Sequence, residues 1–173
     1  MILAIAPLVR TFAVVVVGAA LTACAPAARV KDHLILAFTG CAETSFDNVD
    51  WSTARTLDIK IRQDEFQPMV IGLARDLPYV LHIHNADTSA HGLRSPTFFR
   101  QAAVAEVTVD GESRDLDGGC ITGVSVPANG AVDVRLIALL EGRYAFEDPA
   151  WLGLGLGLGL YEDSNGFGTI VVE

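Results

Sequence analysis

The sequence predicts an all-β protein, a single β-sandwich of about seven or eight strands. Three observations support this class. Short segments alternate apolar and polar residues with a period of two, as half-buried strands do. Turn-forming pairs such as Asp110-Gly111 and Asn129-Gly130 lie near them. After the N-terminal region, no segment carries an apolar stripe of helical spacing that is long enough for a major helix.

The expected strands combine β-branched or aromatic residues with nearby turn signals. The first, Thr56-Leu57-Asp58-Ile59-Lys60-Ile61, shows the alternation most clearly. A short helical turn is expected around Pro96 to Gln101. The other strands are expected at residues 79–84, 103–109, 121–126, 131–137, 144–146 and 168–172.

Length and charge limit the architecture and the partners. The 173 residues are about half apolar, which is enough for one domain with a genuine core and too short for two comfortable ones. The formal net charge is −9, and the twelve basic residues form no cluster that would bind a phosphate backbone. Nucleic acid is therefore excluded as an expected partner.

The N-terminus is expected to be a targeting segment. Arg10 precedes an apolar run, residues 12–21, that is too short to span a bilayer comfortably. The following Leu21-Thr22-Ala23-Cys24 resembles the bacterial lipobox, which implies lipid on Cys24. We expect a signal peptide at residues 1–23, a lipid anchor and tether within 24–55 and the folded domain at 56–173. The alternative is an ordinary secretory signal cleaved nearby; on either interpretation the protein is exported.

A second lipobox-like segment, residues 34–41, ends at Cys41, but its apolar run is short and follows Asp32. If Cys24 carries lipid, Cys41 and Cys120 could form a disulfide in an oxidising envelope compartment. If Cys41 carries lipid, Cys120 is left single. The sequence leaves both arrangements open.

A histidine-led turn follows the strand expected at residues 79–84. It lies within the pattern Pro78-Tyr79-Val80-Leu81-His82-Ile83-His84-Asn85-x-Asp87-x-x-x-His91, which is preceded by Phe66-x-Pro68. The pattern continues with Ser95-Pro96-Thr97-Phe98-Phe99, then Gly142-Arg143-Tyr144-Ala145-Phe146, then Gly168-Thr169-Ile170-Val171-Val172-Glu173. Over about residues 56–173 this set resembles the cupredoxins.

The resemblance implies a Greek-key sandwich with a copper site at one end. In that family an early histidine is joined by a cysteine, a second histidine and often a methionine from the last loop. His91 matches the early histidine, whereas Asp148 or Glu147 occupies the cysteine position. No histidine follows His91, and the methionine position contains Gly166-Phe167. A blue copper centre, which needs soft thiolate and imidazole ligands, therefore cannot be assembled.

Two other metal sites remain candidates. His82 and His84 are two residues apart on one strand, so they project to the same face and could chelate together. The family alignment puts Leu81 and Ile83 in the core and this pair on the outer face. The second candidate joins His91 to acidic residues of the last loop, a donor mixture that suits Cu(II), Zn(II) or Fe. These acidic residues are Glu147, Asp148, Glu162 and Asp163.

The run of alternating glycine and leucine at residues 152–160 is expected to be a mobile apolar loop. It is either a tolerated insertion or, within Trp151 to Tyr161, a contact surface for an envelope partner or the membrane.

The chain lacks a nucleophile elbow, a P-loop and a dinucleotide fingerprint, and we expect no enzyme. The expected function is weak handling of copper or another divalent metal; the alternatives are a metal-free interaction module and, third, electron transfer.

Overall fold

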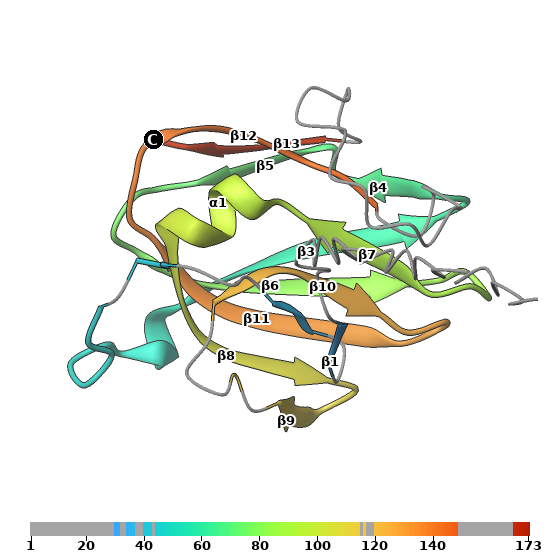
Figure 1. Ribbon diagram of the computed structural model, residues 1–173, viewed down its shortest axis with the longest axis horizontal. Helices are drawn as coiled ribbons and strands as arrows, with labels where there is room; N and C mark the ends of the chain where they lie inside the picture. The colour runs from blue at the N-terminus through green and yellow to red at the C-terminus, as the bar shows by residue number, and fades with distance from the viewer. Residues whose placement is uncertain are drawn as a thin grey trace, which may run out of the picture.

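The protein is a β-sandwich with one short α-helix, in a computed structural model that describes residues 30–31, 34–36, 40–42, 44–114, 116, 120–148 and 168–173 (Figure 1). The all-β class predicted from the sequence is confirmed. In chain order the elements are β1 (Val30–Lys31), β2 (Leu34–Leu36), the 3-10 helix η1 (Trp51–Thr53), β3 (Arg55–Arg62), β4 (Glu65–Gln67), β5 (Val70–Leu73), β6 (Pro78–Asn85), β7 (His91–Arg94), α1 (Pro96–Gln101), β8 (Ala102–Val109), β9 (Glu112–Arg114), β10 (Ile121–Val126), β11 (Ala131–Ala138), β12 (Gly142–Phe146) and β13 (Gly168–Val172).

One layer of the sandwich is a six-stranded sheet in the order β4-β3-β6-β11-β8-β9. Its centre is antiparallel, because β11 pairs with both β6 and β8. The pairing of β3 with β6 is parallel, and it sets Asp58 opposite His82 and Lys60 opposite His84. This register fixes which side chains share the outer face of the sheet.

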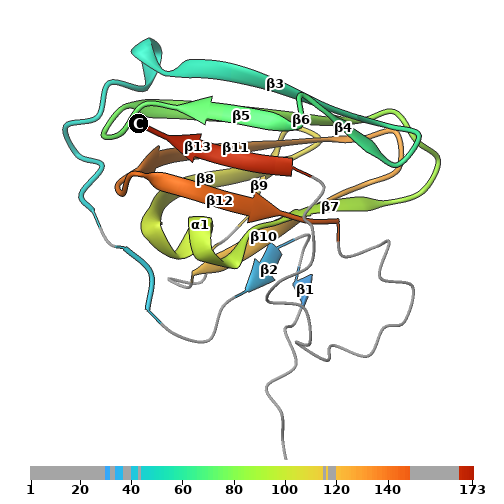
Figure 2. The same cartoon turned by 90° about the horizontal axis from the view of Figure 1, so that it is seen from above.

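The other layer is built from two smaller sheets, β1-β2-β10-β7 and β12-β13-β5 (Figure 2). They meet at an isolated bridge between Arg94, at the end of β7, and Glu147, just after β12. Each of these residues donates its backbone N–H to the carbonyl of the other at 2.9 Å. The bridge therefore brings the end of β12 beside the strand that begins with His91.

The core lies between these layers, and the strands bury alternate residues as the period of two predicts. On β6, Leu81 and Ile83 are fully buried, while His82 is half-buried and His84 is exposed. The histidines thus lie on the outer face, as the resemblance implied. Burial of the apolar side chains is the main stabilising contribution to such a sandwich. The largest fully buried side chains are Phe66, Phe98, Phe99 and Phe146.

The seven strands predicted from the sequence match β3, β6, β8, β10, β11, β12 and β13, and the expected helical turn is α1. The additional strands are short: β1, β2, β4, β5, β7 and β9 have two to four residues each. Such segments are too short to show a period of two, so the alternation test does not detect them.

Gly123 allows β10 to approach β7 closely. A Cβ atom at this position would lie 2.5 Å from the carbonyl oxygen of Leu93 and 2.7 Å from the Cα of Arg94. Gly123 also pairs with Arg94 across the two strands. A glycine at this point lets the backbones approach and fixes β7, which carries His91, against β10.

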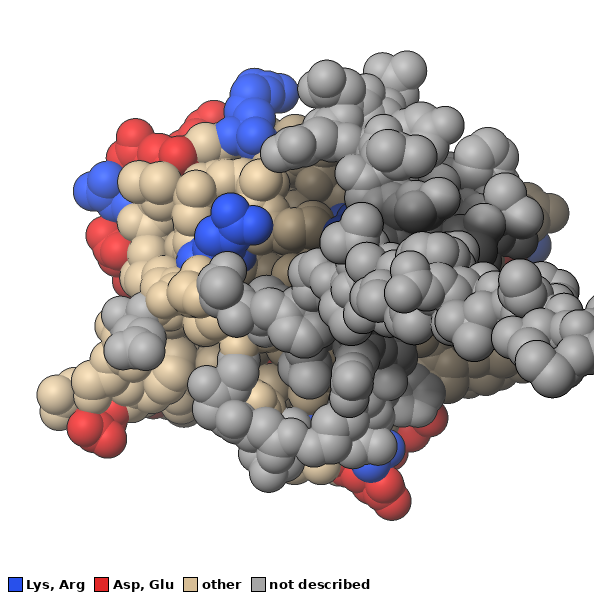
Figure 3. All heavy atoms as spheres, in the orientation of Figure 1, with Lys and Arg blue, Asp and Glu red and all other residues tan. Residues whose placement is uncertain are grey.

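Charged side chains of both signs are interspersed over the described part of the face seen in Figure 3. Ion pairs among the described residues include Arg75 with Glu141 and Arg135 with Glu106. This distribution agrees with the absence of a basic cluster in the sequence. Among the described residues, no helix is long and apolar enough to cross a membrane.

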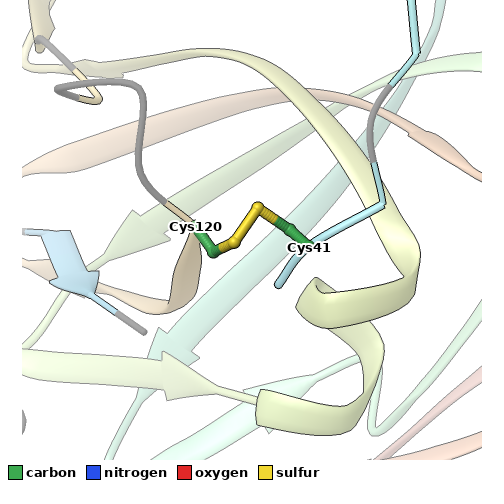
Figure 4. Close-up of a disulfide and its surroundings, with 2 residues drawn as sticks. All are labelled: Cys41 and Cys120. Atoms are coloured by element: carbon green, nitrogen blue, oxygen red, sulfur yellow. A yellow bond between two sulfur atoms is a disulfide. The ribbon is translucent and has the colours of Figure 1, made fainter. Parts of the chain in front are cut away.

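The segment before residue 56, where a lipid anchor and tether were expected, contributes two short strands to the fold. Strand β2 pairs with β10, and Leu34 is buried in the core cluster. Cys41, which follows β2, forms a disulfide with Cys120, which precedes β10 (Figure 4). The edge of β10 needs a partner, and β2 supplies it from outside the boundary expected at residue 56. The signal segment and Cys24 lie outside the described residues.

Candidate functional site

The loop between β6 and β7 is organised by Asn85, a fully buried side chain. Its Nδ2 donates to the carbonyl oxygens of Ser89, Val126 and Pro127, at 2.8, 3.3 and 2.9 Å. Its Oδ1 accepts the backbone N–H of Asp87 at 2.9 Å. Asparagine provides both donors and an acceptor, so one side chain fixes both ends of the turn that precedes His91.

Asp87 connects this loop to the turn between β3 and β4. Gln63 and Asp64 occupy the left-handed region, with φ of 56° and 59°. Their N–H groups donate to the Asp87 carboxylate at 2.9 and 3.1 Å. These two bonds, the Gln63 bond first, lower the pKa of Asp87 by more than burial raises it, and the charges of His91 and Arg62 lower it further to a smaller extent. Asp87 is therefore held as a carboxylate beside Asp64.

His91 is almost fully buried, and one of its nitrogens contacts Asp148. The side chains of His91 and Asp148 are 4% and 3% exposed, and Nδ1 lies 2.6 Å from Oδ2. The other oxygen, Oδ1, accepts the backbone N–H of Gly92 at 2.9 Å. One of the two residues considered for the cysteine position of the resemblance, Asp148, is thus hydrogen-bonded to His91, which matches its early histidine.

The second nitrogen of His91, Nε2, faces two more carboxylates. It lies 3.3 Å from Asp87 Oδ2, 3.6 Å from Asp64 Oδ1 and 3.1 Å from the hydroxyl of Ser89. One ligand atom from each of Asp64, Asp87 and His91 lies within 4.8 Å of the others. An imidazole with two carboxylates is a donor set that binds divalent transition metals. The excess of negative charge around one histidine also favours a cation.

Glu147 lies beside this cluster but interacts with a different group. Its carboxylate forms a part-buried ion pair with Arg94, which is also its backbone bridge partner. The sequence placed Glu147 and Asp148 as equivalent candidates for the cysteine position. In the structure Asp148 is the one that reaches His91, because β12 exposes alternate residues and Asp148 follows the buried Phe146 by two. Glu162 and Asp163 lie outside the described residues.

His82 and His84 lie on β6, on the outer face of the six-stranded sheet, and their neighbours differ from those of His91. His82 Nδ1 is 2.5 Å from Oδ1 of Asp133 on β11. His84 is exposed and lies between Lys60 and Ala131 in the strand register. A lysine beside His84 disfavours a cation at that residue. The structure does not bring this pair together with His91 in one cluster of ligand atoms.

Asp64 and Asp87 were not among the candidates expected from the sequence. Asp87 stood in the quoted motif, four residues before His91, and Asp64 follows a glutamine in a short polar turn. Neither position has a spacing that marks a metal ligand, since the turn and the loop meet only through the parallel pairing of β3 with β6. The available signal was the Asn85-x-Asp87 pair, because asparagine and aspartate often shape a turn that presents a following side chain.

The geometry agrees with the cupredoxin-like fold expected from the motifs, since the histidine-led loop meets the end of β12 at one end of the sandwich. No family model matches the chain, and the search of curated proteins found no match. Solved structures similar to it include two auracyanins and a multi-copper oxidase.

Auracyanin B covers 72% of this chain and 93% of its own, at 12% identity and a TM-score of 0.45. Auracyanin A, titled a "blue" copper protein from Chloroflexus aurantiacus, covers 68% and 98%, at 13% identity and a TM-score of 0.41. A multi-copper oxidase from Pseudomonas thermotolerans covers 73% of this chain but only 31% of its own, at 14% identity and a TM-score of 0.49. All three TM-scores lie below 0.5, and no function follows from the likeness.

Proposed function

We propose that this protein is an exported, lipid-anchored protein of cupredoxin-like fold that binds a divalent metal ion weakly and is not an enzyme. The observation that supports this proposal is the buried imidazole of His91, whose Nε2 lies 3.3 and 3.6 Å from the carboxylates of Asp87 and Asp64. The imidazole nitrogen at the start of β7, with carboxylate oxygens from the β6–β7 loop and the β3–β4 turn, is the start of a site for Cu(II) or Zn(II). Buffering or delivery of such an ion in the cell envelope is the role we assign.

A blue copper centre does not fit these residues. It requires a thiolate, and Cys41 and Cys120 are joined in a disulfide. The acid at the cysteine position, Asp148, is hydrogen-bonded to His91. No histidine follows His91 in the sequence. The proposed role is therefore metal binding without the redox chemistry of a type 1 centre.

Calorimetric titration of the mature protein with Cu(II) and with Zn(II) tests metal binding. We expect a heat of binding for one ion per chain, and no measurable heat in His91→Ala. Because His91→Ala is also expected to lower stability, Asp64→Asn provides the second variant. The Asp64 side chain is 66% exposed, and asparagine tolerates its left-handed backbone. Asp64→Asn should bind at least about tenfold more weakly.

The matched control removes two other histidines of the same protein. His82→Ala/His84→Ala eliminates the pair on the outer face of β6 and should leave the heat of binding unchanged. Loss of the heat in this control but not in His91→Ala would assign the ion to the outer face and contradict the proposal. A wild-type titration without heat above the buffer would favour the second candidate function.

That second candidate is a metal-free interaction module in which the sandwich is a scaffold. It is favoured by the hydrogen bonds that the protein itself supplies to Asp148 and Asp87, from His91, Gly92, Gln63 and Asp64. Its contact surface would be the loop from Trp151 to Tyr161, which lies outside the described residues. No heat with either ion, together with an intact fold, is the result that it predicts.

The lipid anchor is proposed at Cys24, since Cys41 is part of the disulfide. In a bacterial host we expect the wild-type protein in the membrane fraction, with lipid detected by mass spectrometry on the peptide that begins at Cys24. Cys24→Ser should release the protein from the membrane fraction. Cys41→Ser is the matched control and should stay membrane-bound. Lipid on Cys41, or a membrane-bound Cys24→Ser variant, would contradict the assignment.

A further inference from the structure

We propose that Asp148, which occupies the cysteine position of the family resemblance, is a positioning residue and not a metal ligand, and that the ion binds on the opposite edge of the His91 ring. In this arrangement Nε2 of His91, Asp87 and Asp64 hold the ion, while Asp148 holds the proton on Nδ1. The inference rests on the proposed function. It replaces the ligand set expected from the sequence, in which His91 is joined to acidic residues of the last loop.

The two ring nitrogens of His91 differ in their distances to the neighbouring carboxylate oxygens. Bonds from zinc to imidazole nitrogen and carboxylate oxygen are about 2.0–2.2 Å, so two ligand atoms of a tetrahedral site are about 3.4 Å apart. Nε2 lies 3.3 Å from Asp87 Oδ2 and 3.6 Å from Asp64 Oδ1, close to this separation. Nδ1 lies 2.6 Å from Asp148 Oδ2, which is the distance of a short charge-assisted hydrogen bond. An ion therefore fits between Nε2 and the carboxylates of Asp87 and Asp64. It does not fit between Nδ1 and Asp148.

The three carboxylates around His91 also differ in their exposure to solvent and in their hydrogen bonds. Asp148 is 3% exposed, and both of its oxygens accept hydrogen bonds, from His91 and from the N–H of Gly92. Asp64 and Asp87 are 66% and 19% exposed, so their edge of the ring faces the solvent from which an ion arrives. Although Asp87 accepts two backbone N–H groups, each carboxylate oxygen has two lone pairs and can also bind a metal.

The contact between His91 and Asp148 is of the kind that supports a metal-binding histidine without touching the metal. A metal-binding histidine usually donates its other ring N–H to a carboxylate, which fixes the tautomer and makes the bound nitrogen more basic. Asp148 is placed to do this for His91, and the bridge between Arg94 and Glu147 holds it in place. Asp148 thus controls which nitrogen of His91 carries the lone pair.

The donor set also defines the class of ion. One nitrogen and two carboxylate oxygens, with no sulfur, suit a borderline divalent ion such as Zn(II) or Cu(II). Cu(I) prefers thiolate or thioether ligands, and Mg(II) prefers an all-oxygen, largely hydrated site. We therefore expect Zn(II) and Cu(II) to bind, and Cu(I) and Mg(II) not to bind, at the concentrations used for titration.

The experiment that tests the inference is nitrogen NMR of the histidine rings during titration of the ¹⁵N-labelled mature protein with Zn(II). We expect the Nε2 resonance of His91 to move to the metal-bound range while its Nδ1 keeps its proton. Metal-bound Nδ1 with a protonated Nε2 would overturn the inference but leave metal binding intact. An absence of change at His91 together with an absence of calorimetric heat would instead overturn the proposed function.

Two matched variants extend the same titration. Asp148→Asn removes the charge beside Nδ1 and should weaken Zn(II) binding about 10- to 100-fold. It should also increase the fraction of free His91 with its proton on Nε2, a change that a merely structural role would not produce. Asp133→Asn is the control, because Asp133 makes the same type of contact with His82 at 2.5 Å on the outer face. Equal losses in both variants, or none in Asp148→Asn, would contradict the assignment.

Discussion

Replacement of His91 by alanine is expected to lower the free energy of unfolding by about 3–4 kcal/mol, even in the absence of added metal. The reason is the carboxylate that remains. Asp148 is 3% exposed and would lose the imidazole that lies 2.6 Å from it, while its bond from the Gly92 N–H persists. Removing one partner from a buried pair leaves the other charge desolvated, which costs more than the pair contributes. Urea denaturation followed by circular dichroism measures the change.

Two control variants show whether the lost stability comes from the buried pair of His91 and Asp148 or from the removal of any histidine. His84→Ala removes an exposed imidazole from β6 and should change the free energy of unfolding by no more than about 0.5 kcal/mol. The double variant His91→Leu/Asp148→Leu should recover much of the loss, since apolar pairs often replace buried ionic pairs without a net cost. A loss below about 1 kcal/mol in His91→Ala would show that Asp148 is solvated or otherwise compensated.

The longer strands could be predicted from the sequence because each one is a half-buried element with a local pattern. In β6 and β11 the alternation places Leu81, Ile83, Val132 and Val134 in the core and their neighbours outside. The family resemblance, read onto the same strand, implied that His82 and His84 lie on the outer face, and the structure places them there. Local periodicity suffices where one face of a strand is buried and the other is not.

The cluster around His91 depends on long-range pairing and could be predicted only in part. His91 and Asp148 were found through their order in a family motif, which carries information on tertiary structure that periodicity lacks. Asp64 reaches His91 because β3 lies parallel to β6, an arrangement for which the sequence contains no local signal. The same reason explains why β2 was missed, since its three residues acquire a strand conformation by pairing with β10.

Removal of the disulfide between Cys41 and Cys120 is expected to lower the free energy of unfolding by about 4 kcal/mol. The two cysteines are 79 residues apart, so the crosslink restricts a long segment of the unfolded chain. It also fastens the segment after β2 to the start of β10, where the sheet gains its extra partner. The backbone hydrogen bond from Ala42 to Arg100 at 2.9 Å is retained and keeps part of this attachment.

The measurement compares Cys41→Ala/Cys120→Ala with the parent protein, both carrying Cys24→Ser so that no third thiol interferes. Urea denaturation should show the loss in the double variant, and dithiothreitol should produce a similar loss in the parent alone. Small domains are stable by only about 5–15 kcal/mol, so the variant should remain folded with a much smaller margin. If both proteins unfold at the same urea concentration with and without dithiothreitol, the crosslink does not constrain the unfolded chain. The segment must then be held against β10 by noncovalent contacts, which include the burial of Leu34 and the hydrogen bond from Ala42 to Arg100.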